Sequence, residues 1–361
     1  MEIQYRAFDK PRDYASQRDL FRLSFPDTAG TPVDSDAHYA WKFETYPSPV
    51  ASFQYVASEP DGLVGYYAAI PYAYSLDGTT VTSAMVCDVM THPDRRGKGI
   101  FTRIGHFATA ELAREGAGFA IGYPIRPEVI PGHLKVGWKP VQRLPVYMRV
   151  LGARSLLPGA LQFLAPLLRP LASLLQAWSL FPVAGYSTQV EQRDAFLSRH
   201  TGKDDGEYQR LLQSWVSQNP NALLKTCEFL RWRTAAPGTG YSFVSLRQQD
   251  KLVGVAIARP ARMKGVDTLA VLDCMVLAEH ARGSRAIHQR LRQIALEQHK
   301  DAVACMCSPR SARLLGFAGS AYIRTPYVFT LIVKKLDPRI ADETLYSGDR
   351  WNVFWLDSDD L

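Results

Sequence analysis

The chain has 361 residues, of which 47% are hydrophobic and 21% charged, and its formal net charge is +7. This length exceeds one ordinary hydrophobic core, so we expect a globular protein with two domains. The mild positive charge suits an anionic small ligand, a nucleic acid or an anionic membrane alike, but the lack of a long Lys/Arg block argues against nucleic acid.

The N-terminal residues 1–21 are charged throughout and do not form a signal peptide. The cysteines lie mostly in apolar, strand-like runs, as buried free thiols of a reducing compartment do. We therefore expect a cytoplasmic protein. No His/Cys cluster accompanies Cys305 and Cys307, so we predict no metal site.

The first half of the chain predicts a mixed α/β domain. A turn is expected at the sequence DGTT, residues 77–80, and a helix over 99–114, whose apolar face carries Ile100, Ile104 and Leu112. Strands are predicted around residues 2–8, 51–58, 63–76, 81–90 and 118–124. Tyr66 and Tyr67 should point to opposite faces of one strand.

The sequence HPDRRGKGIF, residues 92–101, joins the strand at 81–90 to this helix. The first turn of a helix exposes unpaired N–H groups and carries a partial positive charge. Gly97 and Gly99 allow close approach to the backbone, and Arg96 and Lys98 add positive charge. Such a turn can bind a phosphate or diphosphate. The alternative is a tight turn that ends in a solvated basic surface.

The segment 155–183 is strongly apolar. Leucines recur at spacings of three and four, while Ser155, Gln162, Arg169 and Gln176 form a narrow polar stripe. Internal prolines predict broken helical pieces, and together with Arg169 they argue against a transmembrane helix. We expect this segment to pack between domains or between the protomers of a homodimer. Contact with the inner surface of the membrane is the open alternative.

The second half of the chain repeats the first. Weak matches keep the same order along the chain, at offsets that drift between 179 and 191 residues: LVGYYAAIP with LVGVAIARP, VCDVM with VLDCM, Arg96-Gly97 with Arg282-Gly283, and Gly137-Trp138 with Gly316-Phe317. The repeat therefore predicts two similar domains in tandem. The predicted organisation is a first domain at 1–150, an apolar linker at 151–183, a second domain at 184–336 and a tail at 337–361.

The C-terminal sequence RWNVFWLDSDDL mixes aromatic and acidic residues. We expect a solvated acidic tail. The alternative is that Trp351, Phe354 and Trp355 pack against a domain and present Asp357 to an amine substrate.

The order of strand, basic glycine turn, amphipathic helix, strand and a short helix ending in KVGWKP resembles the GNAT superfamily of acyl-CoA-dependent N-acyltransferases. The family signature is Gln or Arg, any two residues, Gly, any residue, then Gly or Ala. Arg96 and Gly99 fit it, whereas Phe101 stands at the sixth position. The resemblance implies an α/β fold, a mixed sheet flanked by helices, in two tandem GNAT-like domains.

The resemblance also implies a cofactor site for acetyl-CoA or another acyl-CoA in the first domain. Backbone amides of the turn and the first helical residues would bind the diphosphate, and the strand before them would bind the pantetheine arm. The candidate cofactor-binding residues are Val89, Met90, Arg95, Arg96, Gly97, Lys98, Gly99, Ile100, Phe101 and Thr102. In the second copy Arg285 replaces Gly99, so we expect a degenerate domain that does not bind CoA in this way.

Three residues are candidates for proton transfer. Asp88 is a carboxylate in an apolar strand and could act as the base, although Asp273 in the second copy favours a structural role. By resemblance, His133 stands where a Tyr often serves as the general acid, and an exposed helix histidine is the alternative. Tyr123, at the end of the strand at 118–124, is another candidate acid or a packing residue.

The expected activity is transfer of an acyl group from acyl-CoA to a primary amine of a small molecule, such as an amino sugar or an amino acid, by direct attack in a ternary complex. A non-catalytic acyl-CoA-binding or scaffold protein is the alternative.

Overall fold

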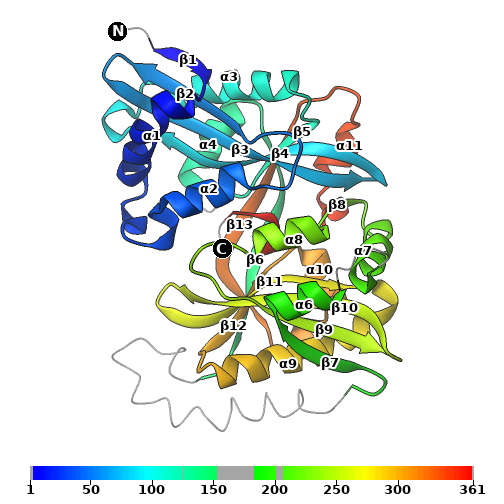
Figure 1. Cartoon of the computed structure of the whole chain (residues 1–361). Coiled ribbons are helices and arrows are strands. Elements are labelled where there is room, and N and C mark those ends of the chain that lie inside the picture. The colour runs from blue at the N-terminus through cyan, green and yellow to red at the C-terminus, as the bar shows by residue number, and fades with distance from the viewer. Residues whose placement is uncertain (1–2, 125, 153–182, 201–205, 360–361) are drawn as a thin grey trace. The chain divides into compact units, whose positions relative to one another are not determined.

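The computed structural model describes residues 3–124, 126–152, 183–200 and 206–359, which fall into two compact units (Figure 1). Unit 1 contains Met1–Gln142, Ala235–Gly238 and Thr330–Arg350, and unit 2 contains Arg143–Thr234, Thr239–Phe329 and Trp351–Leu361. The apolar segment 155–183 lies outside the described residues except for Val183. Among the described residues, no helix is both long enough and apolar enough to cross a bilayer.

Unit 1 is built on one mixed sheet in the strand order β1-β2-β3-β4-β5-β13. Its strands are β1 Gln4–Ala7, β2 Phe53–Glu59, β3 Gly62–Leu76, β4 Thr79–Thr91, β5 Phe119–Gly122 and the last part of β13 Ile323–Lys335. Its helices are α1 Lys10–Ser24, α2 Asp36–Glu44, α3 Ile100–Arg114, α4 Ile130–Lys135 and α11 Asp342–Tyr346. All neighbours pair antiparallel except β4 and β5, which are parallel.

Unit 2 repeats this plan in the strand order β7-β9-β10-β11-β12-β6, with β11 and β12 parallel. Its strands are β7 Ser187–Gln192, β8 Asn221–Leu223, β9 Ser242–Gln248, β10 Lys251–Met263, β11 Val266–Val276, β12 Ala302–Met306 and most of β6 Lys139–Val150. Its helices are α6 Arg193–His200, α7 Glu207–Ser217, α8 Cys227–Arg233, α9 Ser284–Glu297 and α10 Pro309–Leu314. The predicted α/β class and the predicted repeat are both confirmed.

The compact units differ from the sequence halves at one strand each. Strand β5 of the first half pairs with β13, which is the last strand of the second half, through a register that joins Gly122 to Ile332. Strand β12 pairs in turn with β6, the last strand of the first half, and joins Ala302 to Val150. The predicted ranges 1–150 and 184–336 follow the repeat in the sequence, but each folded sheet takes its last strand from the other half.

The two faces of the unit 1 sheet carry different helices, because neighbouring side chains of a strand alternate. Helix α3 packs Ile100, Ile104 and Leu112 against the face that carries Tyr67, as its periodicity predicts. On the opposite face Tyr66 is fully buried and donates a hydrogen bond from its Oη to Gln54 Oε1 at 2.6 Å. The two adjacent tyrosines therefore separate as expected.

The expectation of a solvated acidic tail for the sequence RWNVFWLDSDDL, residues 350–361, was wrong for the described part of this segment, and the alternative that Trp351, Phe354 and Trp355 pack against a domain is confirmed. Helix α11 belongs to unit 1, and residues 351–357 lie inside unit 2, where Trp351, Trp355 and Asp357 have no exposed surface. Asp357 can be buried because its Oδ1 lies 3.0 Å from Lys225 Nζ. The ion pair thus compensates for the cost of burying the Asp357 carboxylate. Burial of the aromatic rings drives the packing of this segment into unit 2.

Candidate functional site

The site begins where β4 and β5 of unit 1 separate. The two strands pair only from Ser83–Phe119 to Met85–Ile121, whereas β4 continues to Thr91. The pairing of β4 with β3 is also interrupted opposite Tyr67, and Asp88 in this bulge has a φ of 46°. A left-handed residue in a strand bends it and redirects its backbone groups. The far part of β4 therefore presents a backbone edge that β5 does not cover.

An ion pair holds this bulge. Lys42 Nζ of α2 lies 2.9 Å from Asp88 Oδ1, and the exposed fractions of the two side chains are only 7% and 15%. Asp88 was predicted as a base, with a structural role as the alternative. The Lys42 contact favours the structural alternative, because a bonded carboxylate fixes the strained backbone on which it sits.

The basic glycine turn follows β4 directly. Gly97 and Gly99 have φ values of 77° and 73°, and a β-carbon at either glycine would meet no atom within 4 Å. Gly99 caps α3, which begins at Ile100 and has no acidic residue in its first turn. The amide groups of this turn have no carbonyl partner within the helix, so they can bind an anion.

A pocket of about 860 Å³ lies along the free part of β4 and the start of α3. The lining residues are Ser24, Phe25, Val89, Met90, Thr91, Arg95, Arg96, Gly97, Gly99, Ile100, Phe101, Thr102, Arg126, Glu128, Val129, Gly132 and Lys135. Nine of the ten predicted cofactor-binding residues are among them. Lys98 is not, and its carbonyl accepts a hydrogen bond from Arg103 Nη2 at 2.9 Å.

Ser24, Phe25 and Arg126 also line the pocket and were missed by sequence reasoning. Ser24 and Phe25 end α1, and Arg126 lies after β5, with its guanidinium 5.8 Å from the Phe25 ring centroid. No motif marks these positions in the sequence. Ser24 Oγ and Thr91 Oγ1 are buried and have no hydrogen-bond partner within the described chain.

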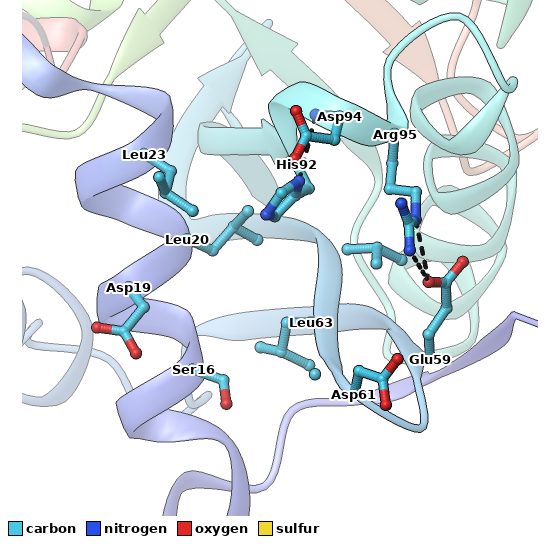
Figure 2. A pocket seen from close by; sticks show the side chains of 12 residues that line it. Ser16, Asp19, Leu20, Leu23, Glu59, Asp61, Leu63, His92, Asp94 and Arg95 are labelled. Carbon is cyan, nitrogen blue, oxygen red and sulfur yellow. Dashed lines mark hydrogen bonds and ion pairs between the residues drawn. The ribbon is translucent and has the colours of Figure 1, made fainter.

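A second, smaller pocket of about 310 Å³ lies beside the same turn and is lined by Asp19, Glu59, Asp61 and Asp94 (Figure 2). Arg95 borders both pockets, and its Nε donates to Glu59 Oε2 at 3.0 Å. The acidic side chains of this smaller pocket would repel an anion. A diphosphate is therefore expected only on the α3 side of the turn.

The bulky Phe101 at the sixth signature position is accommodated by a glycine opposite. A β-carbon at Gly132 would lie 2.6 Å from Phe101 Cε1, so only glycine leaves room for the ring. The ring also meets His133 edge to face, at 5.0 Å between centroids. Phe101 thus packs against α4 while it lines the pocket.

His133 lies in an aromatic cluster. Its ring meets Phe101 and Trp138, the exposed fraction of the residue is 6%, and it is not among the pocket-lining residues. Burial lowers the pKa of His133 to about 4, so its imidazole is neutral near pH 7. A neutral imidazole is a poor proton donor to a thiolate, and these surroundings favour a packing role.

Tyr123 directly follows β5 at the point where the strands part. Its Oη lies 3.0 Å from Tyr74 Oη in a largely buried contact. The three predicted proton-transfer residues thus have different surroundings: an ion pair at Asp88, an aromatic cluster at His133 and a second tyrosine at Tyr123. Within the described part of the chain, no group of three His, Cys, Asp or Glu side chains is arranged to hold a metal ion.

Comparisons with known sequences find a related domain in the part of the chain that contains this site. Residues 5–141 match the family model described as the acetyltransferase (GNAT) domain. The tRNA(Met) cytidine acetyltransferase of Aeropyrum pernix is 29% identical over 133 residues, which cover 36% of this chain and 19% of that protein. The chain thus matches about a fifth of that relative's length.

Solved structures support the fold over more than nine tenths of the chain. The GCN5-related N-acetyltransferase from Anabaena variabilis ATCC 29413 superimposes with a TM-score of 0.64 at 13% identity and covers 93% of this chain and 73% of its own. A tandem GNAT protein from the clavulanic acid biosynthesis pathway gives 0.59 at 12% identity, with 94% and 100% covered. At such identities the likeness concerns the fold, including its tandem arrangement.

The contact between Phe101 and Gly132 predicts the effect of one methyl group. Gly132→Ala should push the ring toward the pocket and weaken acetyl-CoA binding by about tenfold, which corresponds to ~1.4 kcal/mol. Calorimetric titration would measure this loss. In the double variant with Phe101→Ala, binding should recover, because the two sites are coupled. Equal losses in the single and double variants would contradict the packing account.

The buried His133 predicts a pH dependence of stability. Because its pKa is about 4 in the folded chain and near 6.5 when unfolded, the unfolded chain binds the proton more tightly between these values. The free energy of unfolding should therefore fall as the pH drops from 6.5 to 4, by up to about 3 kcal/mol from this group. Urea unfolding at several pH values should show a shallower dependence in His133→Phe. The exposed His106, changed to Gln, is the control, and an unchanged slope in His133→Phe would contradict the assignment.

Proposed function

Because this chain carries a GNAT acetyltransferase domain in residues 5–141, we propose that unit 1 transfers an acyl group from acyl-CoA to a primary amine of a small molecule. One observation carries the proposal. The free edge of β4, two left-handed glycines and the first turn of α3 line a single pocket of about 860 Å³. That combination suits a long ligand with an anionic diphosphate and an amide-containing arm.

Unit 1 has the groups that such a ligand needs. Amides from Gly97 to Thr102 would bind the diphosphate, assisted by the positive charge of Arg96, which is among the residues that line the pocket. The backbone of Val89 and Met90 would pair with the amides of the pantetheine arm as an added strand does. The hydroxyls of Ser24 and Thr91 can supply further hydrogen bonds.

The chemistry needs few side chains. The amine nitrogen attacks the thioester carbonyl carbon, the carbon–sulfur bond breaks, and the thiolate takes up a proton while the nitrogen loses one to solvent. Backbone amides near the Asp88 bulge would stabilise the oxyanion. We assign Tyr123 as the proton donor to the thiolate, because it directly follows β5 where the strands part and carries a hydroxyl group, whereas the imidazole of His133 is neutral. Both residues are buried and neither lines the pocket, so the assignment rests on the position of Tyr123 at the strand end.

The acceptor is proposed to be a small amine, such as an amino sugar or an amino acid. The name of the Aeropyrum relative gives a cytidine of tRNA(Met) as its acceptor, but only 19% of that protein is matched. The positive charge of this chain forms no long block, which is the reason to prefer a small acceptor. A panel of amines that includes cytidine and tRNA distinguishes the two classes.

Replacing the glycine that caps α3 tests the cofactor site. Gly99→Arg introduces the residue type that Arg285 has at the same position of the second copy. It also introduces backbone strain at a φ of 73° and places a side chain over the helix start. Affinity for acetyl-CoA, measured by calorimetry, should fall at least about tenfold. Gly78→Arg is the matched control, because Gly78 also has a positive φ, of 83°, and open space around it.

Release of free CoA with the amine panel then tests turnover. Binding to the original chain without turnover on any amine would favour an acyl-CoA sensor instead of an enzyme. Undiminished binding by Gly99→Arg would remove the basis of the proposed site.

Replacing the proposed proton donor tests the mechanism. Tyr123→Phe should lower kcat by about 100-fold with little change in KM for acetyl-CoA, as expected for loss of a general acid. His133→Phe should change kcat by less than about threefold, because a packing residue does not act on the reacting atoms. Steady-state kinetics from pH 6 to 10 would measure both. The opposite ranking of the two variants would transfer the role to His133.

A further inference from the structure

Unit 2 contains the same separation of parallel strands as unit 1. Strands β11 and β12 pair from Thr268–Ala302 to Val271–Cys305 and then part. In unit 1 the corresponding separation borders the pocket described above. In unit 2 the C-terminal segment 351–357 lies beside both parted strands.

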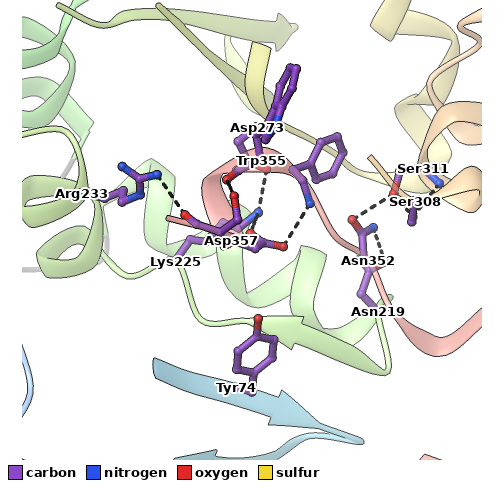
Figure 3. Close-up of polar contacts among 12 residues, drawn as sticks. Tyr74, Asn219, Lys225, Arg233, Asp273, Ser308, Ser311, Asn352, Trp355 and Asp357 are labelled. Carbon is purple, nitrogen blue, oxygen red and sulfur yellow. Dashed lines mark hydrogen bonds and ion pairs between the residues drawn. The ribbon is translucent and has the colours of Figure 1, made fainter. Parts of the chain in front are cut away.

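On the β12 side, the segment continues the sheet. Phe354 forms an antiparallel bridge with Cys307, and Ser308 donates its N–H to the Val353 carbonyl at 2.9 Å. Asn352 Oδ1 accepts a hydrogen bond from Ser311 Oγ of α10 at 3.1 Å (Figure 3). Backbone groups that β12 would otherwise leave unpaired are thereby satisfied.

On the β11 side, the segment is held by buried charges. Lys225 Nζ lies 2.7 Å from Asp273 Oδ1 and 3.0 Å from Asp357 Oδ1, and all three side chains are at most 2% exposed (Figure 3). Asp273 occupies in the repeat the position of Asp88, which binds Lys42 in unit 1. The same strand position is thus paired with a lysine in both units, but in unit 2 the lysine also anchors the C-terminal segment.

The helix start in unit 2 is covered as well. Gly283, which caps α9, has a φ of −68° and lacks the left-handed turn of Gly99. A β-carbon on Gly283 would lie 2.7 Å from Tyr186 Cε1, so the Tyr186 ring rests directly on this position. Tyr186 is fixed in turn by a contact of 3.2 Å between its Oη and His280 Nδ1. An anion cannot approach these amides as it can in unit 1.

We propose that segment 351–357 is a permanent internal occupant of the unit 2 groove, taking the place that the cofactor arm takes in unit 1. Because this segment and the Tyr186 ring occupy unit 2, the chain binds one acyl-CoA although it has two GNAT copies. The comparison with unit 1 rests on the proposed function, but the occupancy of the unit 2 groove does not. Unit 2 then serves as a folded support whose core includes residues 351–357.

Hydrogen exchange of the full chain, with and without saturating acetyl-CoA, tests the two units separately. We expect slower exchange at 89–102 on addition of acetyl-CoA and no change at 273–287 or 308–314. Amides of 351–357 should be protected in both samples. Protection at 273–287, or faster exchange at 351–357, would show that the cofactor enters unit 2 and would overturn the proposal. No change in either unit would contradict the proposed function of unit 1 while upholding the inference for unit 2.

Thiol labelling tests the occupant without any cofactor. Cys274 and Cys305 are at most 2% exposed, and both belong to the same buried cluster as Phe354. In Asp357→Ala, and in a chain that ends at Arg350, maleimide should label these thiols ~10-fold faster or more, since the groove opens more often. Cys87 of unit 1 is the internal control. Asp357→Ala keeps the test valid if the shortened chain does not fold. Unchanged labelling of Cys274 and Cys305 in Asp357→Ala would overturn the proposal.

Discussion

The structure depends on two parallel strands that separate after a few residue pairs. Backbone N–H and C=O groups along the parted edges need partners, because a buried unpaired group is costly. In unit 1 the edge of β4 borders a pocket together with the glycine turn and the start of α3. In unit 2 the equivalent groove is filled by residues 351–357 of the same chain. In unit 1 an acyl-CoA is expected to supply partners for the parted strand. In unit 2 residues 351–357 of the chain supply them.

Two differences between the copies bear on the cofactor site, and both act in the same direction. Gly99 is left-handed and open, whereas its counterpart Arg285 lies in a helix that begins two residues earlier in the repeat. The lysine that binds the strand aspartate pairs with that carboxylate in unit 1. In unit 2 the corresponding lysine pairs with two carboxylates. In the proposed account, one copy binds the cofactor and the other serves as a support. Since β5 and β12 each pair with a strand from the other half of the sequence, neither half can complete its own sheet.

The sequence predicts those parts of the fold and of the candidate site that depend on neighbouring residues. Periodicity located α3 to within one residue, and paired glycines among basic residues indicated the anion site that we propose. The rest depends on contacts that join distant residues. The ion pair of Lys225 with Asp357 spans more than a hundred residues, so the mixed aromatic and acidic terminus could be interpreted in two ways. The fit of Phe101 against Gly132 and the burial of His133 have no local pattern either.

A crystal structure of the full chain with acetyl-CoA is the most direct test of the central claim. We predict that the diphosphate oxygens lie within hydrogen-bond distance of the amides of residues 97–102, and that the pantetheine arm runs along Val89 and Met90. Residues 351–357 should remain between β11 and β12, and one coenzyme should be bound per chain. A coenzyme bound away from the start of α3, or one that displaces residues 351–357, would contradict the account.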